Sequence, residues 1–178
     1  GNILLYAFEL FIRLYEKAGV TPDTSAAMIL RHNIYGLDID KKAFATARFS
    51  LIMKARKYDK NIFAKNILHN LCEIKEDGNT FANAKLFGSL IKIKDAGGYT
   101  RLRQQAVLLS QKYDIVVTNP PYMGRKSLTD DYILFLRKHY PQSKSELYAA
   151  FIIACLKMLN TNGIFAAVTI HTWMFIRS

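Results

Sequence analysis

The tetrapeptide Asn119-Pro120-Pro121-Tyr122 combines groups that suit chemistry on a planar amine. An amino group conjugated to a ring or a carbonyl is a poor nucleophile, because its lone pair is delocalised, until acceptors draw its two hydrogens out of the plane. The side-chain oxygen of Asn119 and the backbone carbonyl of Pro120 can supply two such acceptors. The prolines have no N–H that competes for them, and they hold φ near the polyproline value. Residues that precede proline are pushed to extended geometry, so the loop is pre-organised.

Tyr122 adds a flat aromatic face to this loop. A planar base can stack on such a face, which is typically worth about 1–3 kcal/mol. The tetrapeptide therefore fits methyl transfer to a planar amine by direct displacement. This reaction needs no strong base, because the amine nitrogen becomes acidic only once it has gained its fourth bond.

The residues directly before the tetrapeptide explain how it would be presented. Residues 113–118, Tyr-Asp-Ile-Val-Val-Thr, form a short β-branched run that predicts a buried parallel strand. Open α/β folds bind their ligands at the carboxyl ends of such strands. We therefore expect the tetrapeptide at the ligand-binding edge of a sheet.

A second candidate site follows another predicted strand, at residues 34–39. Asp38 lies at the end of that strand, where an acidic side chain can accept both hydrogen bonds of a ribose diol. The alternative is that Asp38 or Asp40 only caps the helix that begins at Lys41. We assign the ribose to Asp38 and the helix cap to Asp40.

Hydrophobic spacing predicts the remaining elements, and strands that alternate with helices indicate a doubly wound α/β sheet. At 178 residues, 51% of them hydrophobic, the chain can bury one core, so one domain is expected. Gly19 ends the first helix, Ser145 is the expected N-cap of the last, and Asn162-Gly163 is a predicted turn. Predicted helices cover residues 3–18, 22–32, 41–58, 99–111, 128–138 and 145–159, and predicted strands cover 34–39, 61–64, 113–118 and 164–170.

The net charge of +11 favours a partner made of phosphates. A solvated surface that is merely basic is the alternative, but the charges gather in one stretch and beside the tetrapeptide, which favours nucleic acid. The two groups are Lys54, Arg56, Lys57, Lys60 and Lys65, and Arg125, Lys126, Arg137, Lys138 and Lys144.

Several classes of function are disfavoured. Cys72 and Cys155 have no ligand spacing and are expected to be reduced core thiols, and the four histidines, at 32, 69, 139 and 171, predict no metal site. Neither an 18-residue apolar stretch nor a cleavable leader occurs, which favours a cytoplasmic protein without a membrane partner. A dinucleotide-binding oxidoreductase is not supported, because the chain contains no G-x-G-x-x-G.

A strand followed by Asn-Pro-Pro-Tyr resembles the amine-binding motif of S-adenosylmethionine-dependent N-methyltransferases, above all the DNA adenine-N6 enzymes. Residues 33–40 resemble their second cofactor motif, and residues 146–151 and 159–165 resemble the helix and strand after the catalytic loop. Three further blocks narrow the resemblance to the PglX-type adenine methyltransferases of bacterial BREX phage-exclusion systems, relatives of type IIG restriction-modification enzymes. These blocks are residues 49–56, 81–90 and 172–175, and the resemblance runs from Gly1 to about Arg177.

The resemblance implies a Rossmann-like, doubly wound methyltransferase fold with S-adenosylmethionine as cofactor. It places Asp38 on the ribose, Ile39 against the adenine ring of the cofactor, and Gly1 and Asn2 near its methionine end. Asn119, Pro120, Pro121 and Tyr122 would form the catalytic loop, with Asn119 also beside the cofactor. Glu146 and Tyr148 would line the pocket, although Tyr148 fits a core position equally well, and Asn83 marks the third cofactor motif or else a structural turn.

The same resemblance implies double-stranded DNA as substrate, with the target adenine swung out of the duplex. It also suggests other restriction or phage-defence subunits as partners and host-DNA marking as the biological role. In the family, a strand and a Gly-rich turn precede the position of Gly1, and further strands and a target recognition domain follow residue 178. We therefore expect a partial catalytic domain, residues 1–178, incomplete at both ends and inactive when isolated.

Two alternatives to the DNA reaction stay open at this point. Glutamine-N5 methyltransferases and rRNA guanine-N2 methyltransferases use the same tetrapeptide on an amide or on another base. A fragment without catalytic activity is the other alternative. The basic surface and the more specific blocks at residues 49–56 and 172–175 favour DNA adenine.

Overall fold

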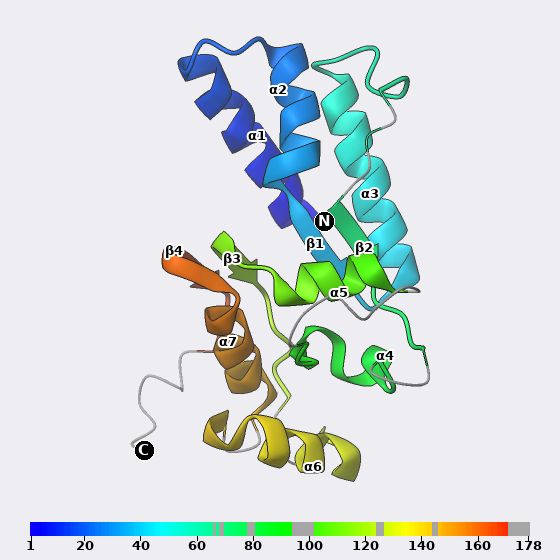
Figure 1. Cartoon of the computed structure of the whole chain (residues 1–178), viewed down its shortest axis with the longest axis vertical. Coiled ribbons are helices and arrows are strands. Elements are labelled where there is room, and N and C mark those ends of the chain that lie inside the picture. The colour runs from blue at the N-terminus through cyan, green and yellow to red at the C-terminus, as the bar shows by residue number, and fades with distance from the viewer. Residues whose placement is uncertain are drawn as a thin grey trace. The chain divides into compact units, whose positions relative to one another are not determined.

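The chain forms two compact units in a computed structural model that describes residues 1–65, 67, 70–77, 81–93, 102–123, 127–143 and 146–170 (Figure 1). The first unit comprises residues 1–88 and 97–108, and the second comprises residues 89–96 and 109–178. Each unit contains one pair of parallel strands among its described residues. Helices and parallel strands alternate along the chain, so the mixed α/β class is confirmed.

The first unit begins with helices and then alternates strands with helices. Gly19, at φ +79°, ends the first helix as predicted, and Pro22 occupies the first turn of the second. The elements are α1 (Asn2–Lys17), α2 (Pro22–Met28), the π-helical turn η1 (Ile29–Asn33), β1 (Tyr35–Asp38), α3 (Lys41–Arg56), β2 (Asn70–Glu73), α4 (Ala84–Phe87) and most of α5 (Arg103–Ser110), with the 3₁₀ turn η2 (Gly88–Leu90) at the junction with the second unit.

The strand predicted at residues 61–64 is wrong, because the side chain of Asp59 imposes a turn there. Its Oδ1 accepts the backbone N–H of Asn61 at 2.9 Å, and its Oδ2 pairs with Lys65 Nζ at 2.7 Å. Asp59 is buried, so this local bonding outweighs the apolar pattern of the segment. The strand that pairs with β1 lies further along, at β2.

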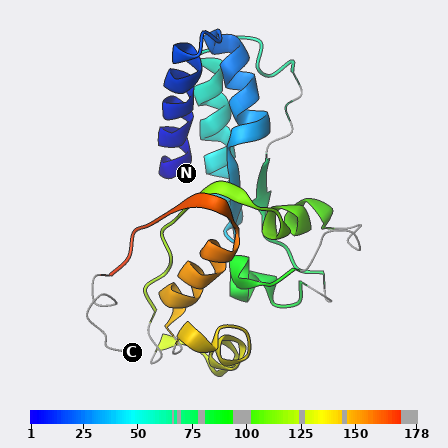
Figure 2. The ribbon, with the colours of Figure 1, turned by 60° about the vertical axis from the view of Figure 1, so that its left-hand side comes forward.

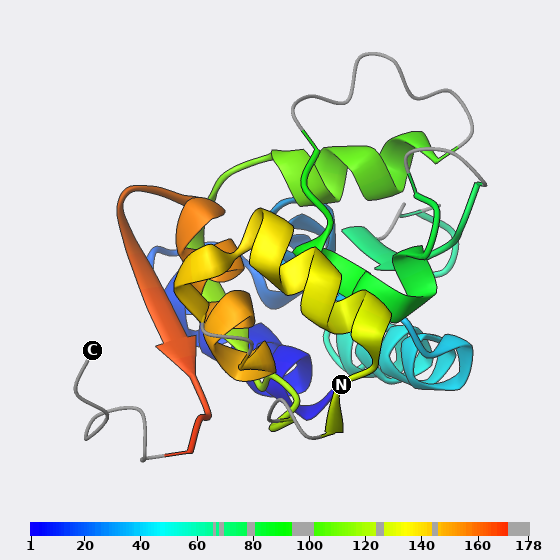
Figure 3. The same cartoon turned by 90° about the horizontal axis from the view of Figure 1, so that it is seen from below.

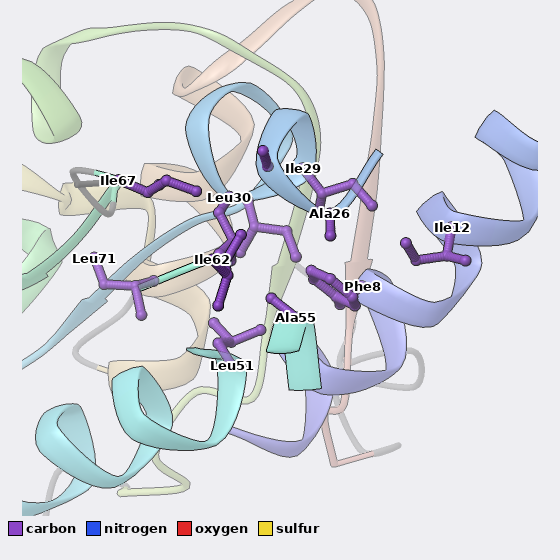
Figure 4. Close-up of a cluster of buried hydrophobic side chains, with 12 residues drawn as sticks. Phe8, Ile12, Ala26, Ile29, Leu30, Leu51, Ala55, Ile62, Ile67 and Leu71 are labelled. Carbon is purple, nitrogen blue, oxygen red and sulfur yellow. The ribbon is translucent and has the colours of Figure 1, made fainter. Parts of the chain in front are cut away.

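Three helices of the first unit, α1, α2 and α3, stand side by side and supply most of its apolar core (Figure 2). Figure 4 shows the side chains of Phe8 and Ile12 on α1 turned toward the same cluster as Leu51 and Ala55 on α3. All four are at most 2% exposed. Burial of these apolar side chains is the main source of stability for the unit.

A polar clamp joins α1 to the end of α3. Glu9 Oε1 pairs with Lys54 Nζ at 2.7 Å, and Glu9 Oε2 accepts the hydroxyl of Tyr58 at 2.6 Å. These two partners, Lys54 first, lower the pKa of Glu9, and the hydrogen bond to Glu9 is the largest cause that raises the pKa of Tyr58 to about 12. The clamp fixes how far the two helices can slide along one another.

Close contact at Gly36 brings both α1 and β2 onto strand β1. A Cβ at this position would lie 2.8 Å from Leu71 Cδ2 and 3.3 Å from Leu4 Cδ1, so only glycine fits without displacement. The pairing is parallel, with Asp38 opposite Glu73. Both strands therefore end at the same edge with an acidic side chain.

Gln105 on α5 stabilises the segment that follows β2. Its side chain is only 1% exposed, and its Oε1 accepts the N–H of Lys75 at 2.7 Å while its Nε2 donates to the carbonyl of the same residue at 3.0 Å. One buried amide thus satisfies both backbone groups of Lys75, as a neighbouring strand would.

The second unit contains one parallel strand pair with its helices. Its elements are β3 (Tyr113–Thr118), α6 (Asp130–His139), the 3₁₀ turn η4 (Pro141–Ser143), α7 (Leu147–Lys157) and β4 (Leu159–Ala167). The helices predicted at residues 128–138 and 145–159 are confirmed, but Glu146 flanks the first turn of α7, and Ser145 lies outside the described residues. Leu136 of α6 and Leu147 of α7 belong to the same buried apolar cluster. In the view from below in Figure 3, α6 is the yellow helix and α7 the orange one.

Strand β4 begins earlier than the strand predicted at 164–170 and contains an irregularity. The register moves from Tyr113 opposite Leu159 to Ile115 opposite Ile164, so the longer strand holds extra residues at this point. Asn162 adopts φ +69° within that stretch. The predicted turn at Asn162-Gly163 is thus a bulge inside the strand rather than its beginning.

The prediction that residues 113–118 form a buried strand is correct for the strand and wrong for its burial. Ile115, Val117 and Ile164 are 55%, 46% and 63% exposed, and they alternate with the half-buried Val116 and Phe165. The apolar run therefore has an accessible face, although α7 packs against both strands of the pair.

We expect replacement of Gln105 by leucine to lower the free energy of unfolding by about 1–3 kcal/mol, because the backbone N–H and carbonyl of Lys75 then lose the two hydrogen bonds that the buried amide supplies. Chemical denaturation followed by circular dichroism measures this change. Leucine at the exposed Gln142 is the matched control and should change stability little. Equal unfolding midpoints for the Gln105→Leu variant and the unmodified chain would contradict the assigned role.

Candidate functional site

The tetrapeptide begins directly after β3, as the sequence predicts. Asn119, Pro121 and Tyr122 are exposed, whereas Pro120 is buried. No peptide bond is cis in the described part of the chain, so both prolines follow trans bonds. The side chain of Asn119 is thereby presented at the carboxyl end of a parallel strand.

Hydrogen bonds tie the loop to the end of the neighbouring strand β4. The hydroxyl of Tyr122 lies 2.7 Å from the carbonyl oxygen of Val168 and 3.0 Å from Oδ1 of Asn119. The N–H of Val168 in turn donates to the carbonyl of Thr118 at 3.1 Å. The first and last residues of the tetrapeptide are therefore fixed against the same two strand ends.

A further backbone bond holds the exit of the loop, where the N–H of Leu147 at the start of α7 donates to the carbonyl of Met123 at 3.2 Å. Residues 124–126 lie outside the described residues. The ring of Tyr122 is 48% exposed, so it can receive a planar group. The loop thus presents the amide oxygen of Asn119 and the aromatic ring of Tyr122 at the strand end.

Two residues expected to line a pocket behave differently from each other. Tyr148 is 4% exposed, and burial raises the pKa of its hydroxyl, so the core alternative is correct. Glu146 is half-buried at the start of α7, and its N–H donates to the carbonyl of Ser143 at 2.9 Å. Within this pair, only Glu146 keeps a side chain available for a ligand.

The two acidic residues after β1 have separate roles, which matches the sequence assignment of the cap. Asp40 Oδ1 accepts the N–H groups of Ala43 at 2.9 Å and Lys42 at 2.7 Å, so it caps α3. These two bonds, that from Ala43 first, lower the pKa of Asp40. Asp38 Oδ1 accepts the N–H of Asp40 at 2.9 Å, which orients a half-buried carboxylate at the end of its strand.

Ile39, between those acids, is 48% exposed and lies against Gly88. A Cβ at Gly88 would approach Ile39 Cγ2 to 3.3 Å, and Gly88 has φ +56°, so glycine is required there. Asn83 lies at the start of α4 with φ +60° and an exposed side chain. This backbone conformation is typical of the structural turn that was the alternative for Asn83.

Gly1 and Asn2 lie at the start of α1, in the same unit as Asp38 and Ile39. A Cβ at Gly1 would lie 3.4 Å from Ala47 on α3, and Leu4, one turn later, lies close to β1 at Gly36. The first unit therefore carries these four candidate cofactor residues, while Asn119 belongs to the second unit.

Sequence reasoning missed the acidic side chain of Glu73, which ends β2 opposite Asp38. The backbone pairing continues one residue further, because the N–H of Ile74 donates to the carbonyl of Asp38 at 2.8 Å. Carboxyl ends of adjacent parallel strands meet at one edge, so correct placement of β2 would have identified this position. The error at residues 61–64 concealed it.

The basic residues divide into paired and accessible groups. Lys54 and Lys65 form ion pairs with Glu9 and Asp59. Exposed cationic side chains remain at Arg56, Lys57 and Lys60, and at Arg137 and Lys138 on α6, whereas Arg125, Lys126 and Lys144 lie outside the described residues. The guanidinium of Arg56 also lies 5.3 Å from the centre of the Phe63 ring.

The described residues show no metal site, disulfide or membrane-spanning helix. Groups of three or more His, Cys, Asp or Glu side chains that could hold a metal ion do not occur there. Both cysteines are free thiols. None of the described helices is long and apolar enough to cross a membrane.

Comparison with known proteins identifies the class of protein. Residues 32–178 match the family model of the Eco57I restriction-modification methylase. The chain belongs to this family. It is 30% identical to the adenine-specific methyltransferase PglX of Lacticaseibacillus casei (strain Zhang) and 28% identical to the adenine-specific methyltransferase BrxX of Escherichia coli O9:H4 (strain HS). Each match covers the whole of this chain but only 19% and 21%, respectively, of the relative. The resemblance inferred from the motifs is confirmed, and the chain spans about a fifth of the length of these relatives.

We expect the cap at Asp40 to contribute stability that depends on pH. Its pKa in the folded chain is lowered from the usual 3.8, so the stabilisation is present above that value and is lost as the pH falls through the folded pKa. The difference in stability between the unmodified chain and Asp40→Ala, measured by urea unfolding, should therefore be largest near neutral pH and should shrink as the pH falls below 3.8.

Asparagine at position 40 is the matched control, because it retains a capping oxygen without a charge. Asp40→Asn should be more stable than Asp40→Ala by an amount that does not change with pH, and less stable than the unmodified chain at neutral pH. A difference between Asp40→Ala and the unmodified chain that does not change with pH would exclude the carboxylate as the origin of the stabilisation.

Proposed function

We propose that this chain is the catalytic segment of an S-adenosylmethionine-dependent methyltransferase that modifies N6 of adenine in DNA. The observation that carries this proposal is the Asn119–Tyr122 loop, which presents an amide oxygen and an accessible aromatic ring at a parallel strand end. The relatives are named adenine-specific methyltransferases, which agrees with a planar amine as acceptor. Marking of host DNA in restriction-modification or phage exclusion is the role this reaction would serve.

The residues of the first unit fit the proposed cofactor. Asp38 has an oriented carboxylate at a strand end, as required for two hydrogen bonds to a ribose diol. Ile39 is accessible for contact with an adenine ring, and Gly1 and Asn2 are exposed near β1, where the methionine end would lie. Glu73 on the adjacent strand is an additional candidate at this edge. When bound, S-adenosylmethionine supplies the methyl group.

The same arrangement supports the Rossmann-like, doubly wound methyltransferase fold as the architecture of the whole domain. Both strand pairs are parallel, and each is followed at its carboxyl end by the residues proposed to bind ligands. Ligand sites at the carboxyl ends of parallel strands are the rule in open α/β sheets.

The proposed mechanism uses hydrogen bonding and orientation by this chain. Asn119 Oδ1 and the carbonyl of Pro120 accept the two hydrogens of N6 and draw them out of the ring plane, which restores the lone pair of N6 as a nucleophile. Tyr122 stacks on the extruded base and holds it for in-line attack on the methyl group. The proton of N6 leaves after the C–N bond has formed, so no strong base is needed.

Double-stranded DNA is the proposed partner because exposed cationic side chains lie at the end of α3 and on α6. Arg56, Lys57 and Lys60 extend from the end of α3, and no acidic residue occurs within that helix. Contacts of this kind bind phosphates without reading the base sequence. Other restriction or phage-defence subunits stay a prediction from the resemblance, and a cytoplasmic location stays a prediction from the hydropathy of the sequence.

We expect Asn119→Ala in the full-length protein to lower kcat by about 100-fold or more, as for loss of a preorganised group at a reacting centre. Transfer of labelled methyl groups to duplex DNA measures kcat, and calorimetry should show unchanged cofactor affinity. Asn160→Ala is the control, because Asn160 is an exposed asparagine on β4 that bonds Asp114. Unchanged turnover in Asn119→Ala would refute the proposed function, and transfer to a glutamine side chain or to rRNA instead would select an alternative acceptor.

We expect glutamine at Arg56, Lys57 and Lys60 together to reduce the salt dependence of DNA binding. The slope of log K against log salt is negative, and each lost phosphate contact reduces its magnitude by about 0.9. Fluorescence anisotropy with duplex DNA over a range of salt concentrations measures this slope. Lys54→Gln is the control, since Lys54 is already paired with Glu9. Identical slopes for the triple variant and the unmodified protein would remove this surface from the DNA contact.

A further inference from the structure

The hydroxyl of Tyr122 lies between two acceptors that belong to different parts of the loop. One is the carbonyl oxygen of Val168 at 2.7 Å, and the other is Oδ1 of Asn119 at 3.0 Å. A phenol carries a single proton, so these two oxygens share one donor. Stacking of a base uses only the ring and gives no reason for this placement of the hydroxyl.

The acceptor on Val168 is held by the strand ladder rather than by a side chain. Thr118 pairs in register with Ala167, and the N–H of Val168 donates to the carbonyl of Thr118 at 3.1 Å. The Val168 carbonyl therefore has a fixed position relative to the residue that directly precedes Asn119. A hydroxyl bonded to it is equally fixed.

Asn119, by contrast, has an exposed side chain that the strand ladder does not fix. Within the described part of the chain, the contact with Tyr122 is the hydrogen bond that its carboxamide makes. A free exposed side chain would have to be ordered during each reaction, and prior orientation avoids this entropic cost. The carboxamide oxygen has two lone pairs, so one can accept from Tyr122 while the other stays available.

We propose that the hydroxyl of Tyr122 is a positioning group that fixes the carboxamide of Asn119 with one oxygen lone pair directed at the target amine. This inference rests on the proposed function and adds a second task for Tyr122 besides stacking. Asn119 is the catalytic residue, and Tyr122 acts on the amine through it. The anchor of the arrangement is the backbone of β4 at Val168.

The first unit contains a matched bond that serves as an internal control. The hydroxyl of Tyr15 on α1 donates to Oδ1 of Asn33 at 3.0 Å, the same chemical pair at the same distance as Tyr122 and Asn119. Tyr15 and Asn33 are both half-buried and belong to the first unit, so they take no part in the loop. Removal of each hydroxyl separates loss of a Tyr–Asn bond from loss of its position in the site.

The test compares Tyr122→Phe, Tyr122→Ala and Tyr15→Phe in the full-length protein, by steady-state methylation of duplex DNA. Tyr122→Phe retains the ring, so KM for DNA should stay unchanged while kcat falls about three- to tenfold, the effect of one net hydrogen bond. Tyr122→Ala should lower kcat further and raise KM, because the ring is also lost. Tyr15→Phe should change neither parameter.

Three other outcomes would contradict either the positioning role of Tyr122 or the proposed function. An unchanged kcat in Tyr122→Phe would overturn the positioning role, and the proposed function would stand as long as Asn119→Ala is inactive. Equal losses of kcat in Tyr122→Phe and Tyr15→Phe, with equal shifts of the thermal unfolding midpoint, would assign the effect to stability and also overturn it. Retained activity in Asn119→Ala would instead contradict the proposed function itself.

Discussion

Parallel pairing of β3 with β4 is the constraint on which the candidate active loop depends. The ladder places the carbonyl of Val168 beside Thr118, and that carbonyl accepts the hydroxyl of Tyr122. The two prolines restrict the backbone between these anchored ends. A short segment with few contacts of its own is thereby ordered by backbone groups of two strands. This explains how an exposed loop can hold an asparagine ready for a reaction.

The first unit shows a similar arrangement at the edge proposed to bind the cofactor. Gly36 lets β1 approach both β2 and α1, and the parallel register then brings Asp38 and Glu73 to one edge. The cap at Asp40 turns the chain immediately into α3, so Asp38 lies at the last position before the backbone leaves the sheet. Acidic side chains at such an edge are costly to desolvate, and a ligand with hydroxyl donors relieves that cost.

The elements that could be predicted from the sequence are those set by interactions between residues close together in the chain. The strand before Asn119, the helix end at Gly19 and the cap at Asp40 were predictable because each follows from one residue type at one position. The error at residues 61–64 arose from Asp59, whose buried carboxylate is paired with Lys65 and organises a turn. The pairing is local, but the burial of the carboxylate depends on the packing of the unit, and a pattern of apolar residues reveals neither. The burial of Tyr148 and the exposure of Ile115 have the same origin, since packing between elements decides both.

Two roles that could not be predicted belong to residues that act through their backbone atoms. Val168 contributes a carbonyl to the loop and Lys75 contributes both of its backbone groups to Gln105, so neither side chain reveals the role. Almost any residue at position 168 would provide the same acceptor, whereas the proposed mechanism needs both the ring and the hydroxyl of Tyr122. Phenylalanine at position 122 would keep the ring but not the hydroxyl. The chemical identity of the site is therefore concentrated in Asn119 and Tyr122, while its geometry is set by strand pairing that many sequences could form.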